Sequence, residues 1–139
     1  TLHVGDLERI EASGAWEIDA DGIETDALIL TLSGAGSADL HDLSADSFTI
    51  AISGAGEADV SGRVASQEIE ISGIGEYRGE DLRSESASVL VSGAGKVIVW
   101  ATDSLDITVD GAGEVDYYGN PQVNLNESGA ADINDLGEK

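Results

Sequence analysis

Acidic side chains recur along this chain at a nearly constant interval and could hold a cation or share a proton. Asp19, Asp39 and Asp59 are spaced by 20 residues, and Glu57 and Glu76 by 19. Carboxylates brought together repel one another unless they share a proton or meet a cation. Oxygen ligands suit Ca²⁺, and paired carboxylates can cleave glycosidic bonds. Three interpretations stay open: a solvated acidic face, weak calcium binding, and a paired-carboxylate glycosidase or lyase.

Aromatic side chains follow the same interval in the last third of the chain. Trp100 and Tyr118 are 18 residues apart, and Glu80 precedes Trp100 by 20. If the interval is a structural repeat, these side chains lie on neighbouring turns and point outward. A Trp–Tyr pair beside a carboxylate could serve as a stacking platform for a sugar or a peptide. The competing interpretation is a packing contact with the N-terminal segment or with another subunit.

The interval comes from a repeat that spans the whole chain. Aliphatic residues occupy the positions four and two before, and four and six after, the first glycine of a recurring SGAG motif, which is the alternation of a strand with one buried face. A short unit without a helical segment cannot bury this face alone, so the units must stack. The first glycines, spaced by 18 to 20 residues, are Gly14, Gly34, Gly54, Gly73, Gly93, Gly111 and Gly129.

The stacked repeats predict an all-β fold, a single-chain parallel β-helix (solenoid) of about seven turns of 18–20 residues. A meander of hairpins is disfavoured because it would reverse every second strand. We expect one β-helix domain over residues 1–139. Within it, residues 1–9 form an N-terminal lead-in, 10–126 the repeats and 127–139 a polar C-terminal cap.

The glycines of the motif are expected to serve the turns of the coil. A phosphate-binding loop needs a helix after the glycines, and no helical pattern follows any of them. Both glycines of each motif are instead expected to allow a positive φ at a corner. These structural glycines are Gly34, Gly36, Gly54, Gly56, Gly73, Gly75, Gly93, Gly95, Gly111 and Gly113.

The composition restricts the partners of the chain. The formal net charge of −22 disfavours binding to nucleic acid and to anionic membrane surfaces. The chain has no cysteine, so disulfides and zinc–thiolate sites are excluded. The sequence contains no stretch of 18 apolar residues, so it predicts no transmembrane segment. No signal peptide precedes Thr1, and we expect that one has been removed from an exported precursor.

The repeats and the segment VDGAGEVDYYGNPQVNLNESGAADI together resemble a bacterial family, the putative auto-transporter adhesin, head GIN domain. Its most specific part is a GxG, an acidic residue, Tyr117–Tyr118, Gly119 and then Pro121. The resemblance implies a right-handed β-helix, export to the periplasm or cell surface, and adhesion, without naming binding residues. The last repeat departs from the pattern, since Ala131 replaces the second glycine and Glu127 an apolar residue.

The sequence therefore predicts a non-enzymatic, exported module for surface interaction, with a glycan or a protein as partner and no cofactor beyond weakly bound Ca²⁺. One alternative is a polysaccharide-cleaving enzyme with an acidic pair near Trp100, which would depend on Glu80 or Glu114. Another is a structural module that assembles through its open ends or a lateral face, because unpaired edge strands invite association.

Overall fold

The computed structural model describes residues 7–137, and almost all of them are in strands. The elements are β1 (Leu7–Ala12), β2 (Ala15–Asp21), β3 (Glu24–Tyr118) and β4 (Gln122–Asp135). β3 is 95 residues long because the chain keeps an extended conformation through its corners. No helix occurs within residues 7–137, and hence none that could cross a membrane.

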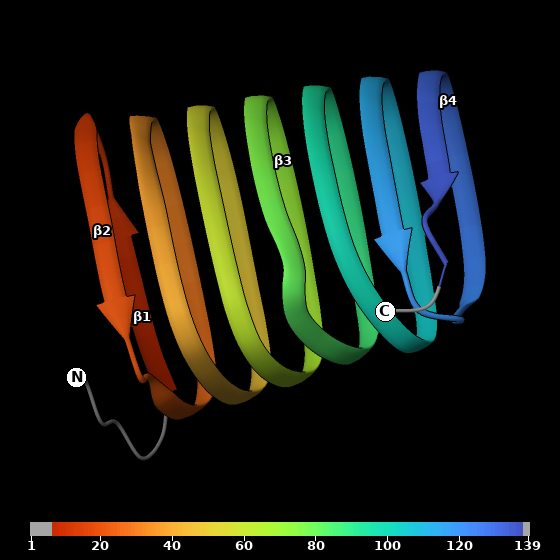
Figure 1. Ribbon diagram of the computed structural model, residues 1–139. Helices are drawn as coiled ribbons and strands as arrows, with labels where there is room; N and C mark the ends of the chain where they lie inside the picture. Colours follow the sequence, from red (N-terminus) through yellow and green to blue (C-terminus); the bar gives the residue numbers. More distant parts are fainter. Residues whose placement is uncertain (1–6, 138–139) are drawn as a thin grey trace.

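The strands coil into a β-solenoid of about seven turns (Figure 1). β1, β2 and β4 each pair with β3 in parallel, and Leu7 pairs with Ala27 at an offset of 20 residues. At the other end Ser104 pairs with Gln122 at an offset of 18. The coil in Figure 1 winds in the right-handed sense. The predicted fold is thus confirmed, and the repeat interval of the sequence is the register of the sheet.

The core consists of aliphatic columns that run along the axis of the solenoid. Each fully buried Leu, Ile or Val side chain contributes about 1.5–3 kcal/mol through removal of apolar surface from water. The columns open at the last turn, where Leu125 is 45% exposed and Glu127 is exposed. Two buried columns are Leu30, Ile50, Ile69, Val89, Ile107 and Leu32, Ile52, Ile71, Val91, Val109.

The first glycine of each motif turns a corner with positive φ, as expected. Gly73 has a φ of 115°, and a Cβ there would lie 2.8 Å from the carbonyl oxygen of Gly54 on the preceding turn. Both the left-handed conformation and the close backbone contact require glycine. At the second bend Asp42 is the only non-glycine residue with positive φ (56°) in the part of the chain that is described.

The second glycine has a different role from the one that the sequence suggested. None of Gly36, Gly56, Gly75, Gly95 and Gly113 has a positive φ, so that expectation was wrong for these positions. A Cβ on Gly95 would lie 3.0 Å from the γ2 methyl group of Ile71, a core residue of the preceding turn. The second glycine therefore leaves room for β-branched side chains of the core.

Both ends of the coil are closed in part by the chain itself. Trp16 takes the second-glycine position of the first turn, its ring lies against Gly36, and its indole Nε1 donates a hydrogen bond of 3.1 Å to the Ser33 carbonyl oxygen. At the other end Gly119 N donates to Gly137 O over 2.7 Å. The predicted cap from residue 127 is continuous with β4 as far as Asp135.

Candidate functional site

Three aspartates of the predicted acidic column lie on the same side of successive turns. Asp19 pairs in register with Asp39, and Asp39 and Asp59 line the same hollow. Partial burial raises the pKa of Asp59 above its ordinary value, and the charges of Asp39 and Glu57 raise this pKa further. The Arg78 guanidinium opposes both effects by favouring the ionised form of Asp59.

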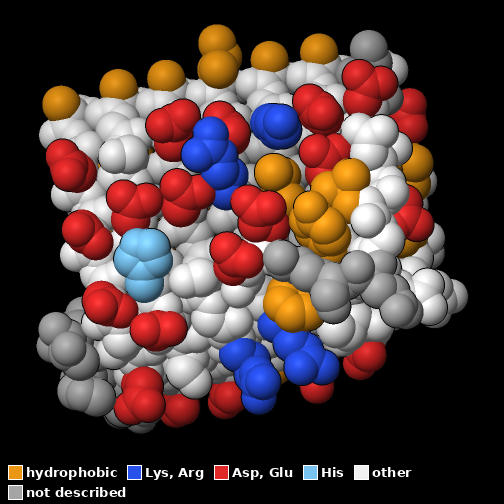
Figure 2. All heavy atoms as spheres, viewed as in Figure 1, with side chains coloured by type: hydrophobic (Ala, Val, Ile, Leu, Met, Phe, Trp, Pro, Cys, Tyr) orange, Lys and Arg blue, Asp and Glu red, His pale blue; other side chains and the backbone are white. Residues whose placement is uncertain are grey.

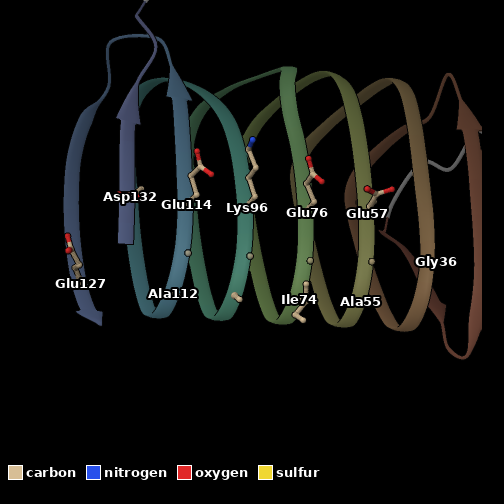
Figure 3. Close-up of a pocket in the computed structure, with 15 residues that line it drawn as sticks. Gly36, Ala55, Glu57, Ile74, Glu76, Lys96, Ala112, Glu114, Glu127 and Asp132 are labelled. Atoms are coloured by element: carbon tan, nitrogen blue, oxygen red, sulfur yellow. The ribbon is translucent and has the colours of Figure 1, made fainter. Parts of the chain in front are cut away.

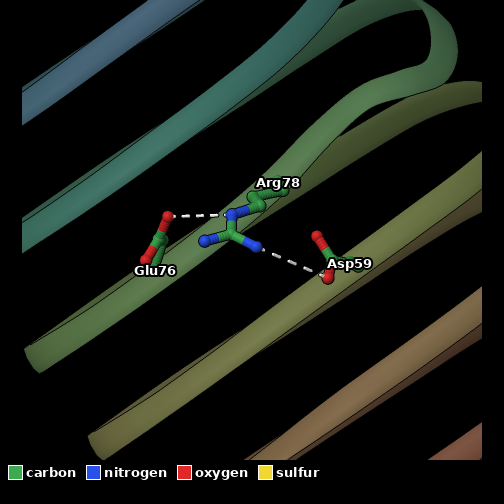
Figure 4. Close-up of polar contacts among 3 residues, drawn as sticks. All are labelled: Asp59, Glu76 and Arg78. Atoms are coloured by element: carbon green, nitrogen blue, oxygen red, sulfur yellow. Dashed lines mark hydrogen bonds and ion pairs between the residues drawn. The ribbon is translucent and has the colours of Figure 1, made fainter.

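Arg78 provides the positive charge that these carboxylates require. Its Nε lies 2.9 Å from Glu76 Oε1, and its Nη1 lies 3.8 Å from Asp59 Oδ2, so one side chain bridges two turns (Figure 4). Hydrogen bonding to Glu76, and the charges of Glu76 and Asp59, raise the pKa of Arg78. Arg78 therefore provides Asp59 and Glu76 with a positive charge that a bound metal ion would otherwise supply.

The predicted calcium ligands do not converge into one site. Asp19 is on the N-terminal turn, whereas Glu57 and Glu76 lie on later turns and line a groove. Within the described residues, no group of three or more acidic, histidine or cysteine side chains is placed to hold a metal ion. Weak calcium binding remains a prediction, and the geometry offers it pairs of carboxylates only.

That groove follows the glycine corner along the axis and has a volume of about 900 Å³ (Figure 3). Its floor is made of glycines and of small side chains such as Ala55 and Ala112, with Ile74 as a 70% exposed exception. A row of exposed hydrophobic side chains runs along one edge of the molecule in Figure 2. The groove wall carries Glu57, Glu76, Lys96, Glu114 and Asp132.

Trp100 and Tyr118 are both half-buried, as is Glu80. The indole ring of Trp100 has the Arg83 guanidinium carbon 6.0 Å from its centroid, which is a cation–π distance. A Cβ on Gly119 would lie 3.3 Å from Trp100 Cδ1, so this glycine keeps space beside the indole. Glu80 lines a different hollow of about 210 Å³ with Asp39, His41, Asp59, Arg78 and Asp81.

A buried chain of hydrogen bonds supports the backbone of Trp100 from inside the core. Tyr77 Oη donates to Gln67 Oε1, and Gln67 Nε2 donates to Ser84 Oγ, each over 2.8 Å. Ser84 Oγ in turn donates to the carbonyl oxygen of Trp100 over 2.9 Å. Complete burial raises the pKa of the Tyr77 phenol, so it remains a neutral donor. This network connects the core to the aromatic surface.

The sequence pattern of one protein family, described as "Putative auto-transporter adhesin, head GIN domain", matches residues 1–121. The chain belongs to this family. Family membership confirms the resemblance carried by the SGAG repeats, and it places this head GIN domain among adhesin-like modules.

Two solved structures share the fold of this head GIN domain. A "putative adhesin" from Parabacteroides distasonis is 24% identical, has a TM-score of 0.90, and is matched over 96% of this chain and 58% of its own. A "putative adhesin" from Bacteroides fragilis is 16% identical, has a TM-score of 0.77, and is matched over 96% and 94%. At these identities the likeness shows the fold alone.

This chain spans somewhat more than half the length of the Parabacteroides chain. No curated protein matches the sequence of this head GIN domain.

Sequence reasoning about this head GIN domain missed the arginines beside the aromatic platform. Arg63 and Arg83 line a hollow of about 570 Å³, and Arg83 also lies over the ring of Trp100. The signal was present, because only six residues are basic and these two are 20 apart, which is one turn of the coil. Figure 2 shows basic side chains gathered near the lower edge of this face.

Proposed function

We propose that this chain is a non-enzymatic, exported binding module of the adhesin type. In this role it presents a lateral face of a rigid rod to a partner at the cell surface. Membership of the adhesin-head family supports the proposal, as does an architecture in which β3 forms most of the chain. The observation that carries it is the half-buried Trp100 ring with Arg83 placed over it.

The coil favours binding through a face over catalysis within a cleft. Residues 24–118 run through the corners of successive turns without a long loop, and loops are where lids and catalytic side chains usually reside. Side chains on a face are held about 4.8 Å apart by the parallel pairing. Such a surface offers a preorganised, repetitive array, which suits recognition because little order is lost on binding.

The proposal is tested by binding of the purified domain to arrays of glycans and of cell-surface proteins, with calcium and with chelator. Trp100→Ala should abolish or strongly weaken any specific binding, since it removes the aromatic face. Ile74→Ala is the matched control, because Ile74 is 70% exposed on the groove at the glycine corner. Equal loss with both variants, or no specific binding at all, would count against the proposal.

A polysaccharide-cleaving enzyme is the second candidate, and the carboxyl groups of Asp39 and Asp59, which line one hollow of about 210 Å³, are the observation that favours it. The raised pKa of Asp59 suits a general acid. The assay is the release of new reducing ends from acidic and neutral polysaccharides. Turnover that disappears in Asp59→Asn, or in Glu80→Gln or Glu114→Gln, would replace the binding proposal with this one.

A further inference from the structure

We infer that Arg63 and Arg83, which line one hollow, bind the carboxylate of an acidic sugar. The inference rests on the proposed binding function and names the class of ligand for the aromatic face. Both arginines are exposed and line the same hollow of about 570 Å³. They are 20 residues apart, which is about one turn of the coil, and neighbouring turns lie about 4.8 Å apart along the axis.

These two guanidinium groups differ from the other arginine of the central turns. Arg78 is neutralised by Asp59 and Glu76. By contrast, no carboxylate among the described residues lies within ion-pair distance of Arg63 or Arg83. On a chain with a net charge of −22, two neighbouring cations without such partners are a local exception. They therefore place two guanidinium groups in one hollow of an acidic surface.

The chemistry of the pair fits a carboxylate. A guanidinium presents its N–H donors as a planar fork that matches the two oxygens of a carboxylate, and two neighbouring forks can hold both oxygens. Arg83 is further oriented by its position 6.0 Å from the Trp100 ring centroid. This stacking restricts its rotamers before a ligand arrives, so less side-chain entropy is lost on binding.

The remaining side chains of the hollow select for hydroxyl groups. Asp46, Glu85 and Asp103 line it together with Thr102. Carboxylates only accept hydrogen bonds at neutral pH, so they favour a ligand that donates several and repel one that carries negative charge throughout. A nucleic acid or a polyphosphate is therefore disfavoured. A sugar acid combines one carboxylate with several hydroxyl donors.

The test is titration of the full domain with tri-galacturonic acid and with 3′-sialyllactose, followed by calorimetry and by NMR shifts of the arginine side chains. The matched neutral probes are the methyl ester of the first sugar and lactose. We expect the acids to bind and the neutral probes to bind at least about tenfold more weakly, because they lose charge-assisted hydrogen bonds. Arg63→Gln and Arg83→Gln should each weaken binding of the acids by a similar factor.

Arg78→Gln is the control, since it changes the net charge by the same amount on a residue outside the hollow. Binding of the acids that is unchanged in Arg63→Gln and Arg83→Gln would overturn the inference, as would equal affinity for acid and neutral probe. Either result leaves the adhesin proposal standing if Trp100→Ala still abolishes binding to other surface ligands. Absence of binding by both acids at millimolar concentration would also overturn the inference.

Discussion

The phenol oxygen of Tyr77 donates a hydrogen bond of 2.8 Å to Gln67 Oε1 inside a core that is otherwise built mainly of aliphatic side chains. Both side chains are buried, and the chain of bonds continues through Ser84 to the backbone of Trp100. A buried polar group is tolerated when its partners are present and is costly when one is removed. The network should therefore be sensitive to small substitutions.

Tyr77→Phe should lower the free energy of unfolding by about 1–3 kcal/mol, because Gln67 Oε1 loses its donor in a buried place. The measurement is urea denaturation followed by circular dichroism. The double variant Tyr77→Phe with Gln67→Leu should recover part of this loss, since it removes the unsatisfied group as well. A Tyr77→Phe variant as stable as the parent chain would show that water or another partner replaces the phenol.

Gly79 and Tyr77 should show strong energetic coupling. A Cβ on Gly79 would lie 2.8 Å from the Tyr77 ring, whereas Val97 and Val99 hold the equivalent positions one turn later. Gly79→Val alone should destabilise the fold by roughly 1–3 kcal/mol through overpacking. Combined with Tyr77→Val, it should cost less than the two single changes added together. Strictly additive effects in a double-mutant cycle would contradict this packing relationship.

Asp59 should make the fold less stable as the pH rises. Its pKa is raised in the folded state, so the folded chain binds more protons at this residue than the unfolded chain does. Stability then falls as the pH increases from the unfolded pKa through the folded pKa. The free energy of unfolding, measured between pH 3 and pH 7, should therefore fall relative to that of Asp59→Asn as the pH rises. A difference that is constant with pH would exclude the effect.

Salt should stabilise the domain because it screens the repulsion within a chain of net charge −22. The melting temperature should rise between low and physiological ionic strength. NaCl and CaCl₂ solutions of equal ionic strength separate screening from the predicted weak calcium binding. A further rise in CaCl₂ that EDTA reverses, and that Asp39→Asn with Asp59→Asn abolishes, would establish calcium at the acidic column. Equal melting temperatures would leave screening as the whole effect.

The fold could be predicted because one interval carries three kinds of information. The spacing of the SGAG motifs defines the length of a turn, the register between turns and the columns of the core. Gly73 illustrates this, since its place in the repeat was enough to predict a positive φ at a corner. The same argument failed for Gly95. Glycine is needed there because a Cβ would crowd a core methyl group one turn away, and local sequence does not reveal that contact.

The surface was harder to predict because the interval shifts between 18, 19 and 20 residues. The sequence does not show where in a turn a residue is omitted, and one omission moves every later side chain relative to its neighbour below. Gly62, for example, lies over Leu43, at an offset of 19. For this reason Trp100 could be placed on a face, but its contact with Arg83 could not be foreseen.

The unbroken path of β3 has a mechanical consequence. Besides the continuous chain, successive turns are joined along the axis mainly by hydrogen bonds between parallel strands and by side-chain packing, so a pull on the chain ends loads one ladder at a time. Each turn of 18 to 20 residues that peels away releases about 60 Å of chain, at about 3.3 Å per residue. Under tension the solenoid should therefore lengthen in steps of one turn and absorb work at each step.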